Sequence, residues 1–236
     1  MKLEYLAQIL AAQMEKRPIA LATRLADGAQ SLYDGVTCSG AVALSAEELA
    51  EARALLATGR SAPLAASQGA IFLRSYTPRA KLVVIGAVHI AQFLAPMAAL
   101  AGFEVIVVDP RRAFASEARF PGVTLVTEWP GPALARIGLD DSTAVVTLTH
   151  DPKLDDPALC AALQSPVFYI GALGSARTHA KRIERLREQG LAELAPRIHA
   201  PVGLDLGGRA AAEIAVSVLA QVIQERYRRA LAPNRS

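Results

Sequence analysis

The chain has 236 residues and a mass of 24.9 kDa, which is enough for one large domain or two modest ones. Its 25 Lys and Arg residues against 22 Asp and Glu residues give a net charge of +3, and with a pI near 9.0 this balance is too mild to indicate a nucleic-acid-binding protein. Hydrophobic residues form 52% of the chain and the mean hydropathy is +0.27, which excludes an intrinsically disordered protein.

The sequence also predicts a cytoplasmic protein without a membrane span. The longest apolar stretch, residues 90–108, is interrupted by polar and helix-breaking residues. The N-terminal segment carries Glu4 and Glu15 between apolar side chains, which predicts an amphipathic helix rather than a secretory signal. Cys38 and Cys160 have no CxxC spacing, so neither a disulfide framework nor a zinc site is expected.

The first part of the chain, residues 1–78, is predicted to form a small α+β domain. Apolar residues at helical spacing near the N-terminus predict a first helix. Extended runs between turn residues predict strands over 19–25 and 70–76. Ser45 and Glu48 have the spacing of a capping box, which predicts that a second helix begins there.

From residue 79 to residue 236, short apolar runs alternate with helical segments. The predicted strands are 82–85, 105–108, 123–126, 143–149 and 166–170. The predicted helices are 89–100, 156–163, 175–189 and 210–229. This alternation predicts an α/β fold with a Rossmann-like, doubly wound parallel sheet in the strand order 3-2-1-4-5. Ligands of such a sheet bind beyond the carboxyl ends of its strands.

The turn after the first of these strands partly matches a dinucleotide-binding fingerprint. Gly86 and Ala91 occupy two of its small-residue positions, and Asp109 ends the next strand, where an acidic residue binds ribose. Val88 replaces the second glycine and is expected to fill the space of a pyrophosphate, whereas His89 lies in the first helical turn beside the same pocket. An NAD(P)-dependent oxidoreductase and a Rossmann domain that binds no dinucleotide tightly both remain open.

Polar residues follow the fourth strand of the predicted sheet. Thr149, His150 and Asp151 lie at its carboxyl end, where they are placed for ligand contact or proton transfer. The alternative is structural, because Asp151 and Asp155 could each cap the helix that follows.

The fifth strand leads into a helix through Gly171, Gly174 and Ser175. Glycines at a helix N-terminus expose backbone N–H groups, and the helix dipole favours an anion there. Arg177 in the first turn could add a bidentate contact to phosphate. A plain tight turn with Ser175 as N-cap is the alternative.

A glycine-rich segment, residues 199–208, leads into the last helix. Asp205 is predicted to face a ligand at the same edge of the sheet, whereas His199 could instead pack in the core. Cys160 lies on the apolar side of a helix and is expected to pack there. Cys38 in a Thr-Cys-Ser-Gly turn gives only weak support for a reactive thiol.

Several of these loops together resemble the XdhC/CoxI family, the accessory factors of xanthine dehydrogenase. The segments that carry the resemblance are 149–159, 169–175 with 177–179, 198–207 and 213–217. The chain differs from the family at Val88, where the family has a second glycine, and at Ala210-Ala211, where it usually has a Thr-Pro pair. Only Cys38-Ser39-Gly40 is comparable to the cysteine motif of longer members.

The resemblance implies a cofactor-binding maturation factor rather than an enzyme. Members are expected to bind the molybdenum cofactor, a molybdopterin, and to assist its sulfuration and insertion. The implied partners are a molybdenum hydroxylase of the xanthine dehydrogenase type and a cysteine desulfurase. A homodimer is one option for the assembly, and neither a catalytic residue nor a metal-ligand set is predicted. The residues predicted to bind the cofactor are Gly86, His89, Asp109, Thr149, His150, Asp151, Gly171, Gly174, Ser175, Arg177 and Asp205.

Overall fold

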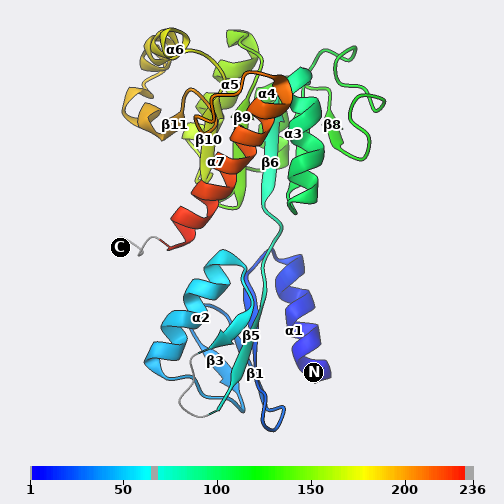
Figure 1. Cartoon of the computed structure of the whole chain (residues 1–236), viewed down its shortest axis with the longest axis vertical. Coiled ribbons are helices and arrows are strands. Elements are labelled where there is room, and N and C mark those ends of the chain that lie inside the picture. Colours follow the sequence, from blue (N-terminus) through cyan, green and yellow to red (C-terminus); the bar gives the residue numbers. More distant parts are fainter. Residues whose placement is uncertain (1, 65–68, 232–236) are drawn as a thin grey trace. The chain divides into compact units, whose positions relative to one another are not determined.

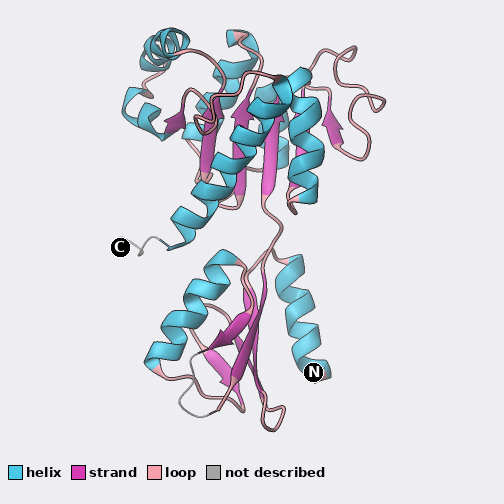
Figure 2. Ribbon diagram, in the orientation of Figure 1, coloured by secondary structure: helices cyan, strands magenta, loops and turns pink. Residues whose placement is uncertain are grey.

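The computed structural model describes residues 2–64 and 69–231, which form two compact units (Figure 1). The first unit contains the described residues up to Pro78 together with those from Tyr227 on, and the second contains Arg79–Arg226. Each unit is built around a sheet of its own (Figure 2). No helix within residues 2–64 and 69–231 is long and apolar enough to span a membrane.

The first unit is an antiparallel sheet with a helix on each face. Its strands, in the order β3-β2-β1-β5-β4, are β1 (Ile19–Arg24), β2 (Gln30–Tyr33), β3 (Cys38–Gly40), β4 (Ala62–Leu64) and β5 (Ile71–Tyr76). Helix α1 (Leu3–Met14) packs against Ile19 and Leu21, whereas α2 (Ala46–Thr58) packs against Ala20 and Ala22. Because side chains alternate along a strand, the two helices cover opposite faces.

The predicted features of this unit are confirmed in part. Ser45 and Glu48 form the expected capping box at the start of α2, and β1 and β5 correspond to the two predicted strands. Strands β2, β3 and β4 were not predicted, because each has only three or four residues and lies beside turn residues. Their pairing with longer neighbours supplies the hydrogen bonds that such short segments need.

The second unit is a six-stranded sheet in which all neighbouring strands are parallel. The strands are β6 (Lys81–Ile85), β7 (Glu104–Val108), β8 (Thr124–Val126), β9 (Thr143–Thr147), β10 (Tyr169–Ala172) and β11 (Ile198–His199). The helices are α3 (His89–Leu100), α4 (Pro130–Ile137), α5 (Pro152–Leu163), α6 (Ala176–Glu188), a 3-10 helix (Ala192–Arg197) and α7 (Ala211–Leu231).

The order β11-β10-β9-β6-β7-β8 confirms the predicted doubly wound arrangement of the first five strands. The two-residue strand β11 and the 3-10 helix were missed because such short segments show little periodicity, and α4 was missed because it opens on Pro-Gly-Pro, a pattern typical of turns. Alternate residues of β6 point to opposite faces of the sheet. Leu82 and Val84 pack with α3 and α7, and Val83 and Ile85 pack with α4, α5 and α6. Helices therefore cover both faces, as Figure 2 shows.

Candidate functional site

The loops after β6 and β9 meet at the carboxyl edge of the parallel sheet. Ile85 is paired with both Val108 and Thr147, so the residues that follow these three strands emerge side by side. Gly86 has a φ of +106°, and a Cβ atom built on it would lie 2.4 Å from Cγ2 of Thr149. Glycine is therefore needed here for backbone conformation and for the contact between the two loops.

Asp109, which follows β7, fixes the loop after β6 through hydrogen bonds. Its side chain is fully buried, Oδ2 accepts a 2.8 Å hydrogen bond from the Ala87 N–H, and Oδ1 accepts the Arg111 N–H at 2.9 Å. The Arg111 guanidinium makes a bidentate ion pair with the same carboxylate. Burial raises the pKa of Asp109, but the hydrogen bonds from Arg111 and Ala87 outweigh it, so the pKa is lowered.

This arrangement corrects the interpretation of Asp109 as a ribose-binding residue. Both carboxylate oxygens are engaged within the protein, and the side chain has no exposed surface. The NAD(P)-dependent alternative, which rested on Gly86, Ala91 and Asp109, thereby loses support from its acidic residue. Val88 is half-buried and packs against the core, and His89 is exposed, with Nδ1 3.2 Å from Oε1 of Gln92.

A second buried carboxylate, Asp155, organises the loop after β9. The Thr149 hydroxyl donates to its Oδ1 at 2.6 Å, and the His150 N–H donates to its Oδ2 at 3.1 Å. These bonds hold His150 in the left-handed region at a φ of +62°, where side chains other than glycine are uncommon. Asp155 is only 2% exposed, and burial raises its pKa despite the hydrogen bond from Thr149 and the attraction of Arg182.

Beside this loop lies a pocket between the start of α5 and one face of α6, here called the α6 pocket. Its lining residues are His150, Pro152, Asp155, Arg177, Thr178, Lys181, Arg182 and Arg185. Three of the four cations on α6, at positions 177, 181 and 185, follow from helical spacing, since residues four apart lie on one face. The Arg185 guanidinium forms a bidentate ion pair with Asp156 of α5, in which Nε donates to Oδ2 and Nη2 donates to Oδ1 at 2.9 Å. The pocket is therefore polar and rich in positive charge.

The glycine turn before α6 combines capping with packing. Ser175 is the N-cap of α6 and accepts the Thr178 N–H at 3.2 Å. Gly174 has a φ of +139°. Gly171 lies within β10, is buried, and would bring a Cβ to 2.5 Å from Val202. Gly171 therefore lies within the strand rather than in the turn before α6, and its lack of a side chain permits close packing there.

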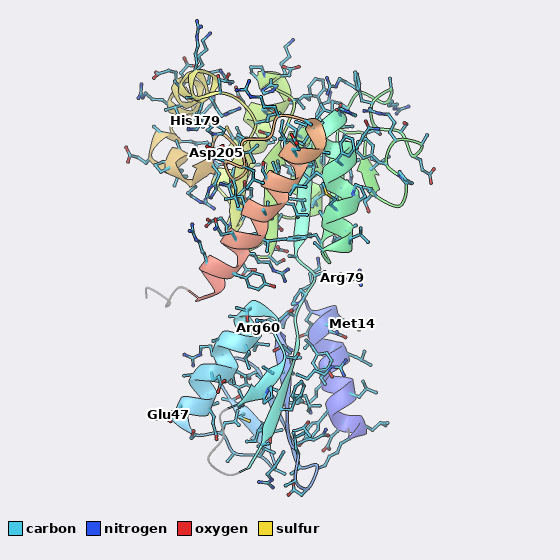
Figure 3. The ribbon with its side chains drawn as sticks, viewed as in Figure 1. Met14, Glu47, Arg60, Arg79, His179 and Asp205 are labelled. Carbon is cyan, nitrogen blue, oxygen red and sulfur yellow. The ribbon has the colours of Figure 1, made fainter. Side chains whose placement is uncertain are left out.

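The last loop is organised separately. Asp205 is exposed and accepts the Gly207 N–H at 3.3 Å, and it does not line the α6 pocket. Figure 3 shows Asp205 on the segment before α7 and His179 on α6. His199 lies in β11 and stacks on Tyr169 with ring centroids 4.8 Å apart, which agrees with the packing alternative.

Neither cysteine lies in an environment that favours a thiolate. Burial raises the pKa of the Cys38 thiol, whose Sγ lies 3.5 Å from the Val42 carbonyl. Cys160 is half-buried and packs against the core, as predicted. Within the described ranges, no group of three or more His, Cys, Asp or Glu side chains is arranged to hold a metal ion.

The sequence profile of the XdhC Rossmann domain matches residues 82–222, the segment that builds this edge. The chain belongs to the XdhC family. It is 45% identical over 96 residues to the molybdenum cofactor insertion chaperone PaoD of Escherichia coli K12. The matched residues make up 40% of this chain and 30% of PaoD. It is 35% identical over 161 residues to a probable xanthine dehydrogenase subunit of Bacillus subtilis 168, covering 67% of this chain and 46% of that protein.

Two further comparisons extend this result. The uncharacterized protein YqeB of Escherichia coli K12 is 35% identical over 157 residues, which are 65% of this chain and 29% of YqeB. The chain thus spans less than half the length of these three relatives. A crystal structure of a xanthine dehydrogenase from Bacillus halodurans shares the fold, with a TM-score of 0.72 and 20% identity over 96% of this chain and 67% of that one.

Of the residues predicted to bind the cofactor, the structure brings His150 and Arg177 together in the α6 pocket. It adds Asp155, Lys181 and Arg182, which sequence reasoning did not assign to the site. The spacing of Arg177, Lys181 and Arg185 was the available signal, because three cations four residues apart share one helix face. No local pattern shows that Arg182 is buried.

Proposed function

We propose that this XdhC-family chain binds the molybdenum cofactor at the carboxyl edge of its parallel sheet and assists insertion of the cofactor into a molybdenum hydroxylase of the xanthine dehydrogenase type. The relatives named as a molybdenum cofactor insertion chaperone and as part of a probable xanthine dehydrogenase support this role. The observation that carries the proposal is the α6 pocket, because four cationic side chains line one opening at the edge where Rossmann-like sheets bind ligands.

The residues present fit an anionic pterin cofactor. The first-turn N–H groups of α6 lack intrahelical partners by geometry, and the helix dipole adds positive potential there. Gly174, Ser175 and Arg177 would hold the phosphate, with Arg177 able to make a bidentate contact. His150, Asp151 and Asp205 would lie toward the pterin and its metal. The bound cargo supplies the redox-active molybdenum centre of the hydroxylase.

The proposal includes protection of the cofactor during sulfuration, with a cysteine desulfurase as sulfur donor, in the cytoplasm. The proposal assigns no role in that step to Cys38 or Cys160, since burial raises the pKa of both thiols and disfavours their thiolates. A homodimer is part of the same hypothesis.

Reconstitution of a cofactor-free molybdenum hydroxylase tests the proposal. The parent chain, loaded with cofactor, is expected to activate the hydroxylase. Arg177→Ala should bind the cofactor about 10- to 150-fold more weakly, because one charge-assisted phosphate contact contributes about 1.5–3 kcal/mol. His150→Ala and Asp205→Ala should mainly impair delivery.

Arg187→Ala is the matched control. Arg187 lies on the same helix but is exposed, is paired with Glu184, and does not line the pocket. If the three site variants bind the cofactor and activate the hydroxylase as well as the Arg187→Ala control does, the proposed site is wrong. If the parent itself binds no pterin, the proposed function is wrong.

A further inference from the structure

Arg182 is the unusual member of the α6 pocket, because its guanidinium is buried without a full set of partners. The side chain is 1% exposed, and Nη2 donates to the Leu173 carbonyl at 2.9 Å. Nε and Nη1 have no hydrogen-bond partner in the described part of the chain. A buried donor without a partner costs free energy, and a buried charge costs more. The fold therefore retains an unfavourable group at the wall of this pocket.

The neighbouring carboxylates do not balance this charge by direct contact. Asp155 attracts Arg182, but its two oxygens accept hydrogen bonds from Thr149 and His150. Asp156 is engaged by Arg185 in a bidentate ion pair. Within the described chain, no ion pair joins Arg182 to an acidic residue.

A count of formal charges gives the sign of the missing group. The cations of the pocket are Arg177, Lys181, Arg182 and Arg185. Asp155 lies among the lining residues, and Asp156 and Glu188 both attract Arg185, so four cations stand against three carboxylates and one positive charge remains. A negatively charged ligand would offset this excess, and oxyanion geometry suits a guanidinium with free N–H groups.

We infer that the α6 pocket is a binding site for a phosphate or diphosphate group, with Arg182 as its inner anchor. This inference deepens the proposed function: the phosphate-bearing part of the cargo extends from the N-terminus of α6 along the helix face past Arg177 and Lys181. The anion offsets the charge of a guanidinium that no carboxylate of the described chain pairs with directly. Arg182 is thus held for ligand binding at the expense of stability, as buried charges at binding sites can be.

Inorganic phosphate and inorganic pyrophosphate are suitable probes, because they carry the inferred chemistry without a pterin. At constant ionic strength set with chloride, either anion should raise the Tm of the full chain and bind measurably by calorimetry. A larger effect of phosphate assigns the pocket to a terminal phosphate group. A larger effect of pyrophosphate assigns it to a diphosphate. If neither anion raises the Tm above the chloride control, the inference is wrong.

Arg182→Met separates a ligand-binding role from a structural one. It should abolish the anion-dependent rise in Tm, whereas the Tm without anion should be no lower than that of the parent. Arg187→Met, an exposed change on the same helix, should retain the rise. If Arg182→Met fails to fold, Arg182→Lys keeps the charge without the guanidinium fork and should weaken anion binding by about tenfold or more. Anion binding by Arg182→Lys equal to that of the parent would overturn the assignment.

The same variants distinguish this inference from the proposed function. Anion binding by the parent without any pterin binding contradicts the proposed function and leaves the phosphate site in place. Cofactor binding and hydroxylase activation that are unaffected by Arg182→Lys contradict the phosphate site and leave the proposed function in place.

Discussion

The two buried carboxylates at the carboxyl edge of the sheet, Asp109 and Asp155, have pKa values shifted in opposite directions. Asp109 accepts backbone N–H bonds and a bidentate contact from Arg111, and its pKa is lowered. Asp155 accepts hydrogen bonds from Thr149 and His150 without a bidentate contact from an arginine among the described residues, and burial raises its pKa. The loop after β6 is thus internally complete, whereas the loop after β9 borders a pocket with unpaired positive charge. The difference supports the proposal that the cofactor binds beside α6.

The largest expected effect comes from removing the complete network. Asp109→Ala leaves the Ala87 N–H buried without a partner and frees Arg111 from its ion pair. We expect a loss of about 3–5 kcal/mol in the free energy of unfolding. Asp151→Ala removes an exposed N-cap that accepts the Lys153 N–H, and should cost about 1 kcal/mol. Urea unfolding of both variants measures the contrast, and equal losses would contradict it.

The contact between the two loops gives the next largest effect. Gly86→Ala places a methyl group against Thr149 at a backbone conformation that disfavours L-residues, so it should cost about 2–4 kcal/mol. Gly102→Ala is the matched control, since Gly102 has a φ of +89° with open space around it. That control should cost only about 1–2 kcal/mol. A Gly86→Ala variant as stable as Gly102→Ala would show that the loops do not pack as described.

The opposite pKa shifts predict opposite pH dependences. The Asp109 carboxylate stabilises the fold above its ordinary pKa of 3.8, and this contribution is lost as the pH falls through the lowered pKa. Asp155 contributes fully below 3.8, and its contribution is lost as the pH rises through the raised pKa. Asp109→Asn should therefore lower the free energy of unfolding more at about pH 7 than at about pH 3. Asp155→Asn should lower it less at about pH 7 than at about pH 3. Equilibrium unfolding at both pH values tests this, and parallel dependences would contradict it.

The smallest effect concerns the strained backbone beside the pocket. His150 and Lys16 are the non-glycine residues with positive φ among the described residues. Replacing either with glycine relieves the steric cost, so each change should leave stability unchanged or raise it by about 1 kcal/mol. Only His150→Gly should also impair cofactor delivery, because Lys16 belongs to the first unit. Impaired delivery by Lys16→Gly would show that the comparison between these positions is misplaced.

The sequence by itself determined the features that depend on neighbouring residues. Continuous apolar runs such as 82–85 identified the buried parallel strands, and Ser45 with Glu48 identified a helix start. Helices and strands in alternation then left the doubly wound sheet as the arrangement that buries every run on both faces. The family resemblance followed from loops that are contiguous in the chain, and the match over 82–222 confirms it.

Only the tertiary structure decided how the edge residues are used. Asp109 accepts a hydrogen bond from Ala87, which lies 22 residues away in the chain. Arg182 donates to the carbonyl of Leu173, and its other guanidinium nitrogens are buried when α6 packs. Periodicity reports which face of a segment is apolar, but it does not report which polar atoms lose their water when segments pack. The sequence therefore indicated an edge rich in candidate ligand-binding residues. Packing selected among them, because it engages Asp109 within the protein and leaves the cations of α6 with an excess of positive charge.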